Sequence, residues 1–482
     1  MKKVTRRQFL GVNAGLAAAA TIAIPGRISA KEVNDRVNMA VIGCGVRGGQ
    51  DMDNFEKNCQ NIDFIGFADP DFGRAQNVGR KHPNATFVED FRKLLDDKNL
   101  DAVIVATPDH WHCLATILAM QAGKDVYVEK PLAHTPWEGR QVVNATRKYD
   151  KICQMGAQQF SDVIQPQIKK FIHEDKAIGE MKSVAVNHYF LRQPIGKRKT
   201  PMQIPAEINY DIWLGPAQDL PIYRNNFHYD WHWIWNTGTG DMGNWCVHIL
   251  GDVVINTLNT MSFPKSIMGG GARLFFNDAG ETPNLQYVYF ETKNVPIVLG
   301  LSNIPYSPGA RYTGKYIGAS TGYVIYCEGG QLRGNRGYAV AVDNDGKVIR
   351  SFKGYSGEGT HQKNFIDGVR THDRSLLTLE IEKAFYYSTW CNLANIAFLA
   401  GKPYTEEVAN QINGHTGGLW EKLMGNMKEL VGNYNATLKE TMISPQMAVD
   451  PVTGRFVGDG LDFANSLLKR EYRKGFEVPD LS

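Results

Sequence analysis

Cysteine is scarce and shows no pattern in this chain. The 482 residues include seven cysteines, an odd number, and no Cys-x-x-Cys pair occurs. The length also excludes a small domain held together by disulfides. We therefore expect the cysteines to be buried small hydrophobic side chains, with neither disulfide nor metal roles, and we expect no metal site.

A strong charge of either sign is absent as well. Lys and Arg number 53 and Asp and Glu number 50, a net charge of +3. Five of these basic residues and no acidic residue lie in the first 30 positions, so the remainder carries a net charge of −2. This balance gives no sign of a nucleic-acid partner, and a nearly neutral surface is typical of an enzyme for small molecules. Hydrophobic residues at 43% exclude a disordered chain.

The apolar run near the N-terminus, residues 11–24, is shorter than the ~20 residues that a membrane-spanning helix needs. It follows Arg6-Arg7-Gln8-Phe9-Leu10 and precedes Ser29-Ala30, a plausible cleavage point. This order resembles a twin-arginine export signal. We predict a signal over residues 1–30, the twin-arginine translocase as partner and a periplasmic location. An amphipathic first helix or a membrane anchor is the alternative.

A nucleotide-binding pattern begins at Val37. Residues 37–42 form an apolar strand that runs into Gly43-Cys44-Gly45-Val46-Arg47-Gly48, which is a G-x-G-x-x-G motif. A helical stretch, a second strand over Ile62–Ala68 and then Asp69 follow, 21 residues after Gly48. The motif alone is weak evidence, but in this strand–turn–helix–strand setting it predicts a dinucleotide site.

Each part of the motif has a physical role in such a site. Gly43 permits the tight turn, Gly45 lets the backbone approach the pyrophosphate, and Gly48 lets helix and strand pack closely. The phosphates would lie on the helix N-terminus. Asp69 can accept hydrogen bonds from a ribose and favours NAD, whereas nearby Arg74 leaves NADP open. The predicted cofactor residues here are Gly43, Gly45, Val46, Arg47, Gly48, Asp69 and Arg74.

Two further parallel strands are expected at residues 101–106 and 125–128. Ligands bind at the carboxyl ends of the strands in such sheets, which places Thr107, His112, Glu129 and Lys130 at the nucleotide cleft. Thr135-Pro136 with Glu138 predicts a capped helix directly afterwards.

From about residue 180 the pattern changes to a mostly antiparallel sheet. Residues 181–189 alternate like a half-exposed strand, and helices are expected over 360–370, 379–399 and, in the tail, near 465–472. The predicted fold class is an α/β Rossmann domain plus an α+β domain with an open, mostly antiparallel β-sheet. The predicted boundaries are 36–157, 158–430 and a C-terminal extension over 431–482.

Four segments carry a resemblance to the Gfo/Idh/MocA oxidoreductases. They are the glycine motif, Thr107-Pro108-Asp109, Glu129-Lys130-Pro131, and residues 238–244 (GTGDMGN) with His248. Trp213-Leu214-Gly215-Pro216 and the signal point to the exported branch of that family. The resemblance implies a cofactor between two domains, a sugar or polyol above the nicotinamide, Lys130 at the reacting hydroxyl, and His248 as proton donor or acceptor.

The residue chemistry agrees with these roles. A cationic nicotinamide disfavours the ammonium form of a neighbouring lysine, and histidine titrates near neutrality. The structural alternatives are an ion pair of Lys130 with Glu129 and a buried, hydrogen-bonded His248. Many relatives have Asp where this chain has Asn244, and Asn cannot act as a base. Asp241 could compensate for that difference.

Five of the nine tryptophans lie between Trp213 and Trp245. Trp231, Trp233 and Trp235 alternate, so in an extended segment they face one side. Broad aromatic faces suit pyranose rings, but an aromatic core or a subunit interface explains most of them equally well. The predicted substrate contacts are Trp231, His232, Trp235 and Trp245.

The sequence thus predicts an exported oxidoreductase that transfers a hydride between a sugar or glycoside ring hydroxyl and tightly bound NAD. The first alternative is an NAD-dependent glycoside hydrolase that uses transient oxidation. The second is a non-catalytic sugar-binding protein with structural NAD. A homo-oligomer is expected from an exposed sheet face.

Overall fold

The first domain of the computed structural model is built on six parallel strands in the order β3-β2-β1-β4-β5-β6. The structure describes residues 36–258 and 261–482, so the predicted export signal lies outside the described residues. The strands are β1 (Val37–Ile42), β2 (Ile62–Ala68), β3 (Thr86–Val88), β4 (Ala102–Val105), β5 (Asp125–Glu129) and β6 (Cys153–Gly156). This order is that of a dinucleotide-binding Rossmann domain.

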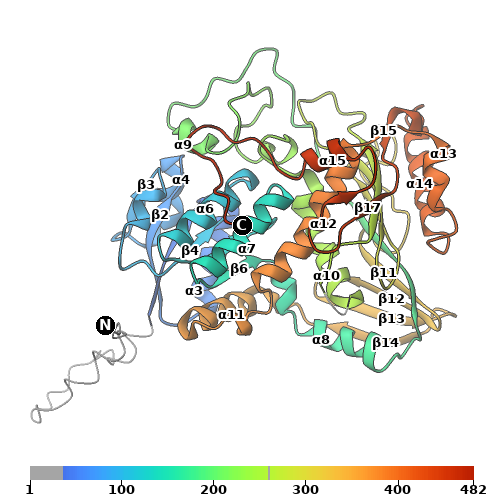
Figure 1. The fold of residues 1–482 in the computed structure, drawn as a ribbon, viewed down its shortest axis with the longest axis horizontal. Helices are drawn as coiled ribbons and strands as arrows, with labels where there is room; N and C mark the ends of the chain where they lie inside the picture. The colour runs from blue at the N-terminus through green and yellow to red at the C-terminus, as the bar shows by residue number, and fades with distance from the viewer. Residues whose placement is uncertain (1–35, 259–260) are drawn as a thin grey trace, which may run out of the picture. The chain divides into compact units, whose positions relative to one another are not determined.

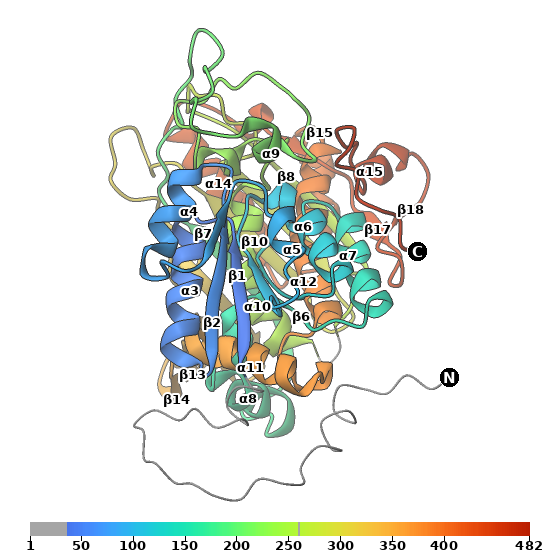
Figure 2. The ribbon, with the colours of Figure 1, turned by 90° about the vertical axis from the view of Figure 1, so that its left-hand side faces the viewer.

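Helices cover both faces of this sheet. Figure 2 shows α3 and α4 on one side of β1 and β2, and α6 and α7 on the other. The helices are α3 (Val46–Asn58), α4 (Phe72–Val78), α5 (Arg92–Leu95), α6 (Asp109–Gln121) and α7 (Pro136–Lys148). Burial on both faces explains why β4 is continuously apolar. The predicted capping box at the start of α7 is confirmed, because Thr135 and Glu138 hydrogen-bond each other's backbone N–H.

The second domain holds a 12-stranded sheet. Its main path runs β14-β13-β12-β11-β7-β10-β9-β8-β16-β15, and β17 and β18 extend from β8. Only the β7–β10 pair is parallel within the described part of this sheet, so the expected mostly antiparallel character is confirmed. The strands are β7 (Met181–Tyr189), β8 (Ser266–Ala272), β9 (Leu285–Glu291), β10 (Ile297–Ser302), β11 (Thr321–Cys327), β12 (Gly330–Asn335), β13 (Tyr338–Asp343), β14 (Val348–Lys353), β15 (Lys402–Pro403), β16 (Met442–Ile443), β17 (Met447–Val449) and β18 (Phe456–Val457).

Both faces of the central strands of this sheet are covered by the chain itself. One face packs on helices that also contact the first domain, and the other packs on α14, where Trp420, Leu423 and Met427 contact strand residues such as Tyr287 and Val298 in one buried cluster. Figure 1 shows α13 and α14 on the side away from the first domain. The helices are α8 (Ile164–Lys169), α9 (Tyr210–Leu214), α10 (Val247–Thr257), α11 (Gly357–Thr371), α12 (Ile381–Leu399), α13 (Glu406–Ala409), α14 (Leu419–Gly432) and α15 (Asp462–Ser466).

This second cover corrects one expectation. Residues 183–189 of β7 are buried on both faces, so the half-exposed strand was wrong. The sheet is exposed at its edge instead, where Val348 and Ile349 of β14 face solvent, and the homo-oligomer stays a prediction.

The tail is part of the second sheet rather than a separate appendage. It supplies β16, β17 and β18, and its last residues return to the first domain, where Leu481 N donates to Gln141 Oε1 at 2.7 Å. The expected helix near 465–472 is instead the single short helix α15, which ends at Ser466. Residues 37–482 form one compact unit.

The seven cysteines all lie in the described part of the chain and are buried, as expected. Among the helices of residues 36–258 and 261–482, none is long and apolar enough to cross a membrane.

Candidate active site

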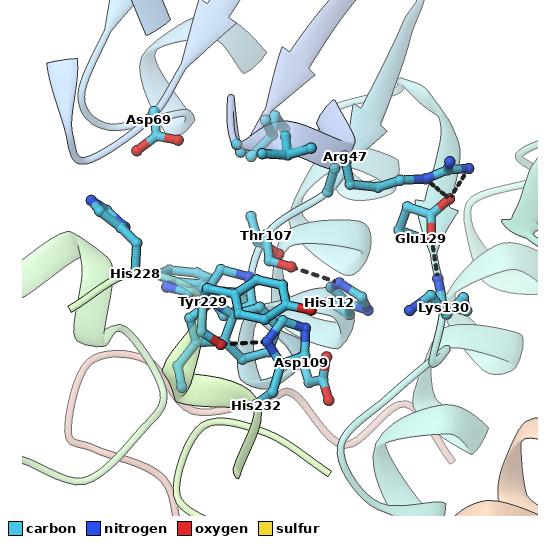
Figure 3. Close-up of a pocket in the computed structure, with 18 of the residues that line it drawn as sticks. Arg47, Asp69, Thr107, Asp109, His112, Glu129, Lys130, His228, Tyr229 and His232 are labelled. Carbon is cyan, nitrogen blue, oxygen red and sulfur yellow. Dashed lines mark hydrogen bonds and ion pairs between the residues drawn. The ribbon is translucent and has the colours of Figure 1, made fainter. Parts of the chain in front are cut away.

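A cleft of about 400 Å³ lies at the carboxyl ends of β1, β4 and β5 (Figure 3). The first domain contributes the glycine turn and the residues that follow β2, β4 and β5. The second domain contributes Trp231, His232, Asn244, Trp245 and His248. The cleft therefore joins the two halves of the predicted site.

The glycine turn has the geometry that its sequence requires. Gly43 has a φ of +91°, and a side chain there would meet the backbone of Ala106 at 2.6 Å. A Cβ on Gly48 would lie 2.0 Å from the Gly43 carbonyl oxygen. Helix α3 begins at Val46 and no side chain of the described residues caps it, so its first N–H groups remain available to an anion in the cleft.

Asp69 lies at the end of β2 with its carboxylate already oriented. Its Oδ2 accepts from Cys44 N at 2.8 Å and its Oδ1 accepts from Asp71 N at 2.9 Å. Burial raises the pKa of Asp69 to about 6, so the carboxylate is ionised at neutral pH. Arg74 also lines the cleft and lies 3.6 Å from Asp71 Oδ2. An ionised Asp69 suits a ribose diol.

Thr107 and His112 lie at the carboxyl end of β4 and at the start of α6. The Thr107 hydroxyl is buried and has no hydrogen-bond partner among the described residues, which fits a ligand in the cleft. His112 joins two strand ends, because its ring nitrogens lie 2.6 Å from Pro131 O and 2.9 Å from Thr107 O (Figure 3).

Glu129 pairs with Arg47 and not with the Lys130 side chain. Arg47 Nε donates to Glu129 Oε1 at 2.9 Å, and Arg47 also pairs with Asp51 at 2.8 Å. Lys130 reaches Glu129 only through its backbone N–H, at 3.1 Å (Figure 3). The ion-pair alternative for Lys130 is therefore not what the structure shows. The Arg47 guanidinium faces Glu129, while its backbone lies in the first turn of α3.

The Lys130 ammonium is held by the second domain. Its Nζ donates to both Asn244 O and Asn244 Oδ1 at 2.9 Å. Burial lowers the pKa of Lys130, although the carboxylates of Glu129 and Asp109 oppose this shift. Asn244 lies in a π-helical turn, Met242–Cys246, directly before α10. Such widened turns are frequent at functional sites.

Asp241 lies behind the cleft rather than in it. Arg192 contacts both of its oxygens at 2.9 Å, and Asn303 donates to Oδ2 at 2.7 Å. Burial raises the pKa of Asp241, but His188, at 3.6 Å, and Arg192 outweigh this effect and hold the pKa well below its ordinary value. The expectation that Asp241 compensates as a base is not supported. Instead its Oδ1 accepts from Asn244 Nδ2 at 3.2 Å and turns the amide oxygen of Asn244 toward Lys130.

His248 is the second residue of α10 and lines the cleft. Its Nδ1 is 3.4 Å from Gln159 Oε1, and Gln159 Nε2 donates to His248 O at 3.0 Å. Burial lowers the pKa of His248 well below its ordinary value, and the positive charges of Arg336, Lys130 and Arg47 lower it further. The imidazole is therefore neutral at neutral pH.

The tryptophan segment is not extended. Asp230–Trp233 forms a 3-10 turn, so side chains two residues apart point in different directions. Trp231 and His232 stack at 3.6 Å and line the cleft, Trp233 is buried, and Trp235 lies 6.3 Å from the ring of Phe398. Trp245 lines the cleft beside His248, at 5.9 Å. The expectation of a common face was wrong, and Trp235 is not among the residues that line the cleft.

Sequence reasoning missed three groups that shape the site: Arg192, Gln159 and Arg336, the last of which also lines the cleft. It also did not predict that residues 190–237, a segment that we call the strap, lie against the first domain. Its main-chain and side-chain groups contact the end of β2 and the loop after β3, and it contributes Trp213, His228 and Tyr229 to the cleft. Figure 1 shows its loops and α9 beside α4.

The glycine turn, the uncapped α3, the oriented Asp69 and the unpartnered Thr107 hydroxyl fit a dinucleotide. In the part of the chain that the structure describes, no group of three or more His, Cys, Asp or Glu side chains could hold a metal ion. Fold and site together define an NAD-binding protein of the two-domain, Rossmann-containing class.

The comparisons with known proteins show which family this chain is similar to. Residues 37–157 match the model of an oxidoreductase family with an NAD-binding Rossmann fold, and residues 167–268 match the model of its C-terminal alpha/beta domain. Over these two regions, which together make up less than half of the chain, it is similar to the Gfo/Idh/MocA oxidoreductases.

Two curated relatives and one solved structure illustrate the range of the match. The scyllo-inositol 2-dehydrogenase (NAD(+)) of Bacillus subtilis (strain 168) is 32% identical over 25% of this chain and 35% of that protein. The D-glucoside 3-dehydrogenase of Escherichia coli (strain K12) is 28% identical over 24% of this chain and 33% of that protein. The WlbA dehydrogenase from Bordetella pertussis, in complex with NADH and UDP-GlcNAcA, has a TM-score of 0.55 at 16% identity and covers 76% of this chain and 95% of that one. The chain thus spans about a third of the length of these two curated relatives, and the solved structure shows a shared fold.

Proposed function

We propose that this protein is an NAD-dependent oxidoreductase that oxidises a ring hydroxyl of a sugar or glycoside. The observation that carries this proposal is the placement of Lys130 Nζ, 2.9 Å from two oxygens of Asn244, inside the dinucleotide cleft. An ammonium has three N–H donors. Two are used by Asn244, so the third is free to bind the oxygen of a substrate hydroxyl.

His248 is suited to take the hydroxyl proton. The amide oxygen of Gln159 can only accept, so it favours the tautomer in which Nδ1 carries the proton and Nε2 keeps its lone pair. Because the pKa of His248 is lowered, the ring stays unprotonated at neutral pH and keeps a lone pair for the proton, although it is a weaker base than an exposed histidine.

Oxidation of the hydroxyl requires a hydride acceptor, a group that binds the hydroxyl oxygen and a base for its proton. The glycine turn and Asp69 would hold NAD, which would supply the hydride acceptor for the substrate carbon. Lys130 orients the hydroxyl and stabilises the negative charge that develops on its oxygen, and His248 receives the proton. Asp241 and Arg192 act through Asn244, because they fix the amide that holds Lys130.

A carbohydrate substrate is supported by the cleft lining and by the relatives. Trp231, His232 and Trp245 present aromatic surface in the cleft, which suits the apolar faces of a pyranose. Two curated relatives bear names of inositol and D-glucoside dehydrogenases. We therefore place the sugar between these rings and Lys130.

We also propose that the protein is exported folded to the periplasm through the twin-arginine route and that it retains its NAD. The periplasm offers no ready NAD pool, so the cofactor has to be recycled rather than exchanged. The strap supports retention. Asn209 N donates to Pro70 O and Asn209 Nδ2 to Glu89 Oε2, both at 2.9 Å, while His228 Nε2 lies 3.0 Å from Asp71 Oδ2. These contacts hold the strap across the Asp69 end of the cleft.

Loosening the strap is expected to release the cofactor. The double variant Asn209→Ala, His228→Ala removes the two side-chain hydrogen bonds to Glu89 and Asp71, each contributing about 1 kcal/mol, and also the Asn209 cap of α9, so NAD should dissociate at least about 10- to 30-fold faster. The measurement is nucleotide remaining per chain, by mass spectrometry, during dialysis. Lys199→Ala, an exposed position of the same segment, is the control and should match the unaltered protein. Complete loss of NAD from the unaltered protein on dialysis would contradict retention.

The proposed function is tested on the purified protein with a panel of sugars and p-nitrophenyl glycosides. A lasting rise in absorbance near 340 nm with a sugar or glycoside, without release of nitrophenol, is the expected result. Nitrophenol release without a lasting 340 nm change would instead establish the redox-assisted hydrolase. Bound NAD that no sugar reduces, without nitrophenol release from any glycoside, would favour a binding protein.

A further inference from the structure

An arginine from the 12-stranded sheet of the second domain lines the cleft. Arg336 lies in the turn between β12 and β13 and lines the same cleft as Lys130 and His248. Its Nη2 donates to the Tyr355 hydroxyl at 3.0 Å, and its guanidinium lies 5.5 Å from the centre of the Tyr355 ring. The side chain is therefore held in place from one side only.

The charge of Arg336 is not balanced by a direct partner. Its Nε is buried and has no hydrogen-bond partner among the described residues, and no ion pair joins it to a carboxylate of residues 36–258 or 261–482. Glu358 is reached only through the Tyr355 hydroxyl, at 3.2 Å. The other arginines near the cleft differ in this respect, because Arg47 pairs with Glu129, Arg74 with Asp71 and Arg192 with Asp241.

Arg336 is therefore the cation at the catalytic end of the cleft that lacks a direct carboxylate partner among the described residues. The ammonium of Lys130 is bound by oxygens of Asn244 and lies near the carboxylate of Asp109, while Glu129 and Asp241 are each paired with an arginine. A buried guanidinium N–H without an acceptor is costly unless a ligand supplies one. A carboxylate matches the planar fork of arginine best.

We propose that the substrate is an acidic sugar, a uronate or aldonate, whose carboxylate binds Arg336 while one of its hydroxyls lies at Lys130 and His248. This assignment rests on the proposed function. Arg336 is then a specificity-determining residue. It is also the charged group with the largest effect on the pKa of His248, which agrees with a position beside the reacting centre.

The same anion chemistry could come from the cofactor diphosphate, so the test separates the two sources. The holoprotein is assayed with matched pairs, D-glucuronate against D-glucose and D-gluconate against D-glucitol, by NAD reduction. The unaltered protein should favour the acids at least 10-fold in kcat/KM. Arg336→Gln should lower kcat/KM for the acids about 100-fold and for the neutral partners less than 3-fold, with bound NAD unchanged. Arg336→Lys should restore part of the loss.

The control is Arg333→Gln, an exposed position on β12 of the same hairpin, which should leave all four substrates unaffected. Equal losses for acids and neutral sugars would overturn the proposal. So would loss of bound NAD in Arg336→Gln alone, because that result assigns the arginine to the diphosphate.

A binding measurement distinguishes failure of the carboxylate site from failure of the proposed oxidoreductase function. If none of the four compounds reduces NAD, tryptophan fluorescence is titrated with D-glucuronate and with D-glucose. Tighter binding of the acid that is lost in Arg336→Gln but not in Arg333→Gln would keep the carboxylate site while the oxidoreductase failed. Binding that does not depend on Arg336 would overturn the site.

Discussion

Lys130→Met is expected to lower the rate of NAD reduction by about 10³-fold while the protein keeps its bound cofactor. Methionine preserves much of the length and volume of lysine but has no N–H donor and no charge. The change removes the group that binds the reacting oxygen, and leaves the glycine turn and Asp69 intact. The measurement is single-turnover reduction of bound NAD at 340 nm with saturating sugar.

The same experiment separates a catalytic lysine from a structural one. Lys130 Nζ also bridges the two domains through Asn244, so a structural role predicts a lower melting temperature and loss of NAD. Asn244→Ala is the matched variant, since it removes the side-chain half of that bridge and keeps the ammonium. We expect a smaller loss of rate in Asn244→Ala than in Lys130→Met. Activity of Lys130→Met within 10-fold of the unaltered protein would exclude the proposed role.

The first half of the fold and of the site was predictable because its signals are local. The turn residues Gly43, Gly45 and Gly48 are read from six consecutive positions, and Asp69 directly follows the next strand, β2. Thr107 and Lys130 follow β4 and β5, and parallel strands bring their carboxyl ends to one edge. The family resemblance then placed Asn244 and His248, which no local pattern could have brought to that edge.

The second domain and the side chains that it adds to the site depend on tertiary packing, which a single sequence does not display. Gln159 and Arg336 reach His248 and its surroundings from positions 89 and 88 residues away in the chain. Their side chains carry no spacing signal. The alternation of Trp231, Trp233 and Trp235 suggested a strand, but the chain turns in a 3-10 conformation there. Strand β7 looked half-exposed because its second cover, α14, comes more than 200 residues later.

The second large effect is expected from a substitution in the glycine turn. Gly48→Ala is expected to reduce bound NAD to less than about a tenth of that in the unaltered protein. The new Cβ would lie 2.0 Å from Gly43 O and 3.2 Å from Val41 Cγ1, and the first of these is a backbone atom that cannot move alone. Helix α3 would have to shift away from β1, and its N-terminal N–H groups would leave the position that binds the diphosphate. Mass spectrometry of the purified protein measures the nucleotide content.

The adjacent glycine gives the sharpest control for this prediction. A Cβ on Gly49, in the same turn of α3, meets Val78 Cγ2 at 3.5 Å, which is ordinary contact. Gly49→Ala should therefore keep its NAD and gain up to about 1 kcal/mol of stability from the higher helix propensity of alanine. If the two variants lost NAD equally, helix composition rather than the approach of α3 to the turn would explain the loss. A Gly48→Ala protein with full NAD content would show that the turn tolerates a wider helix–strand spacing than the contacts indicate.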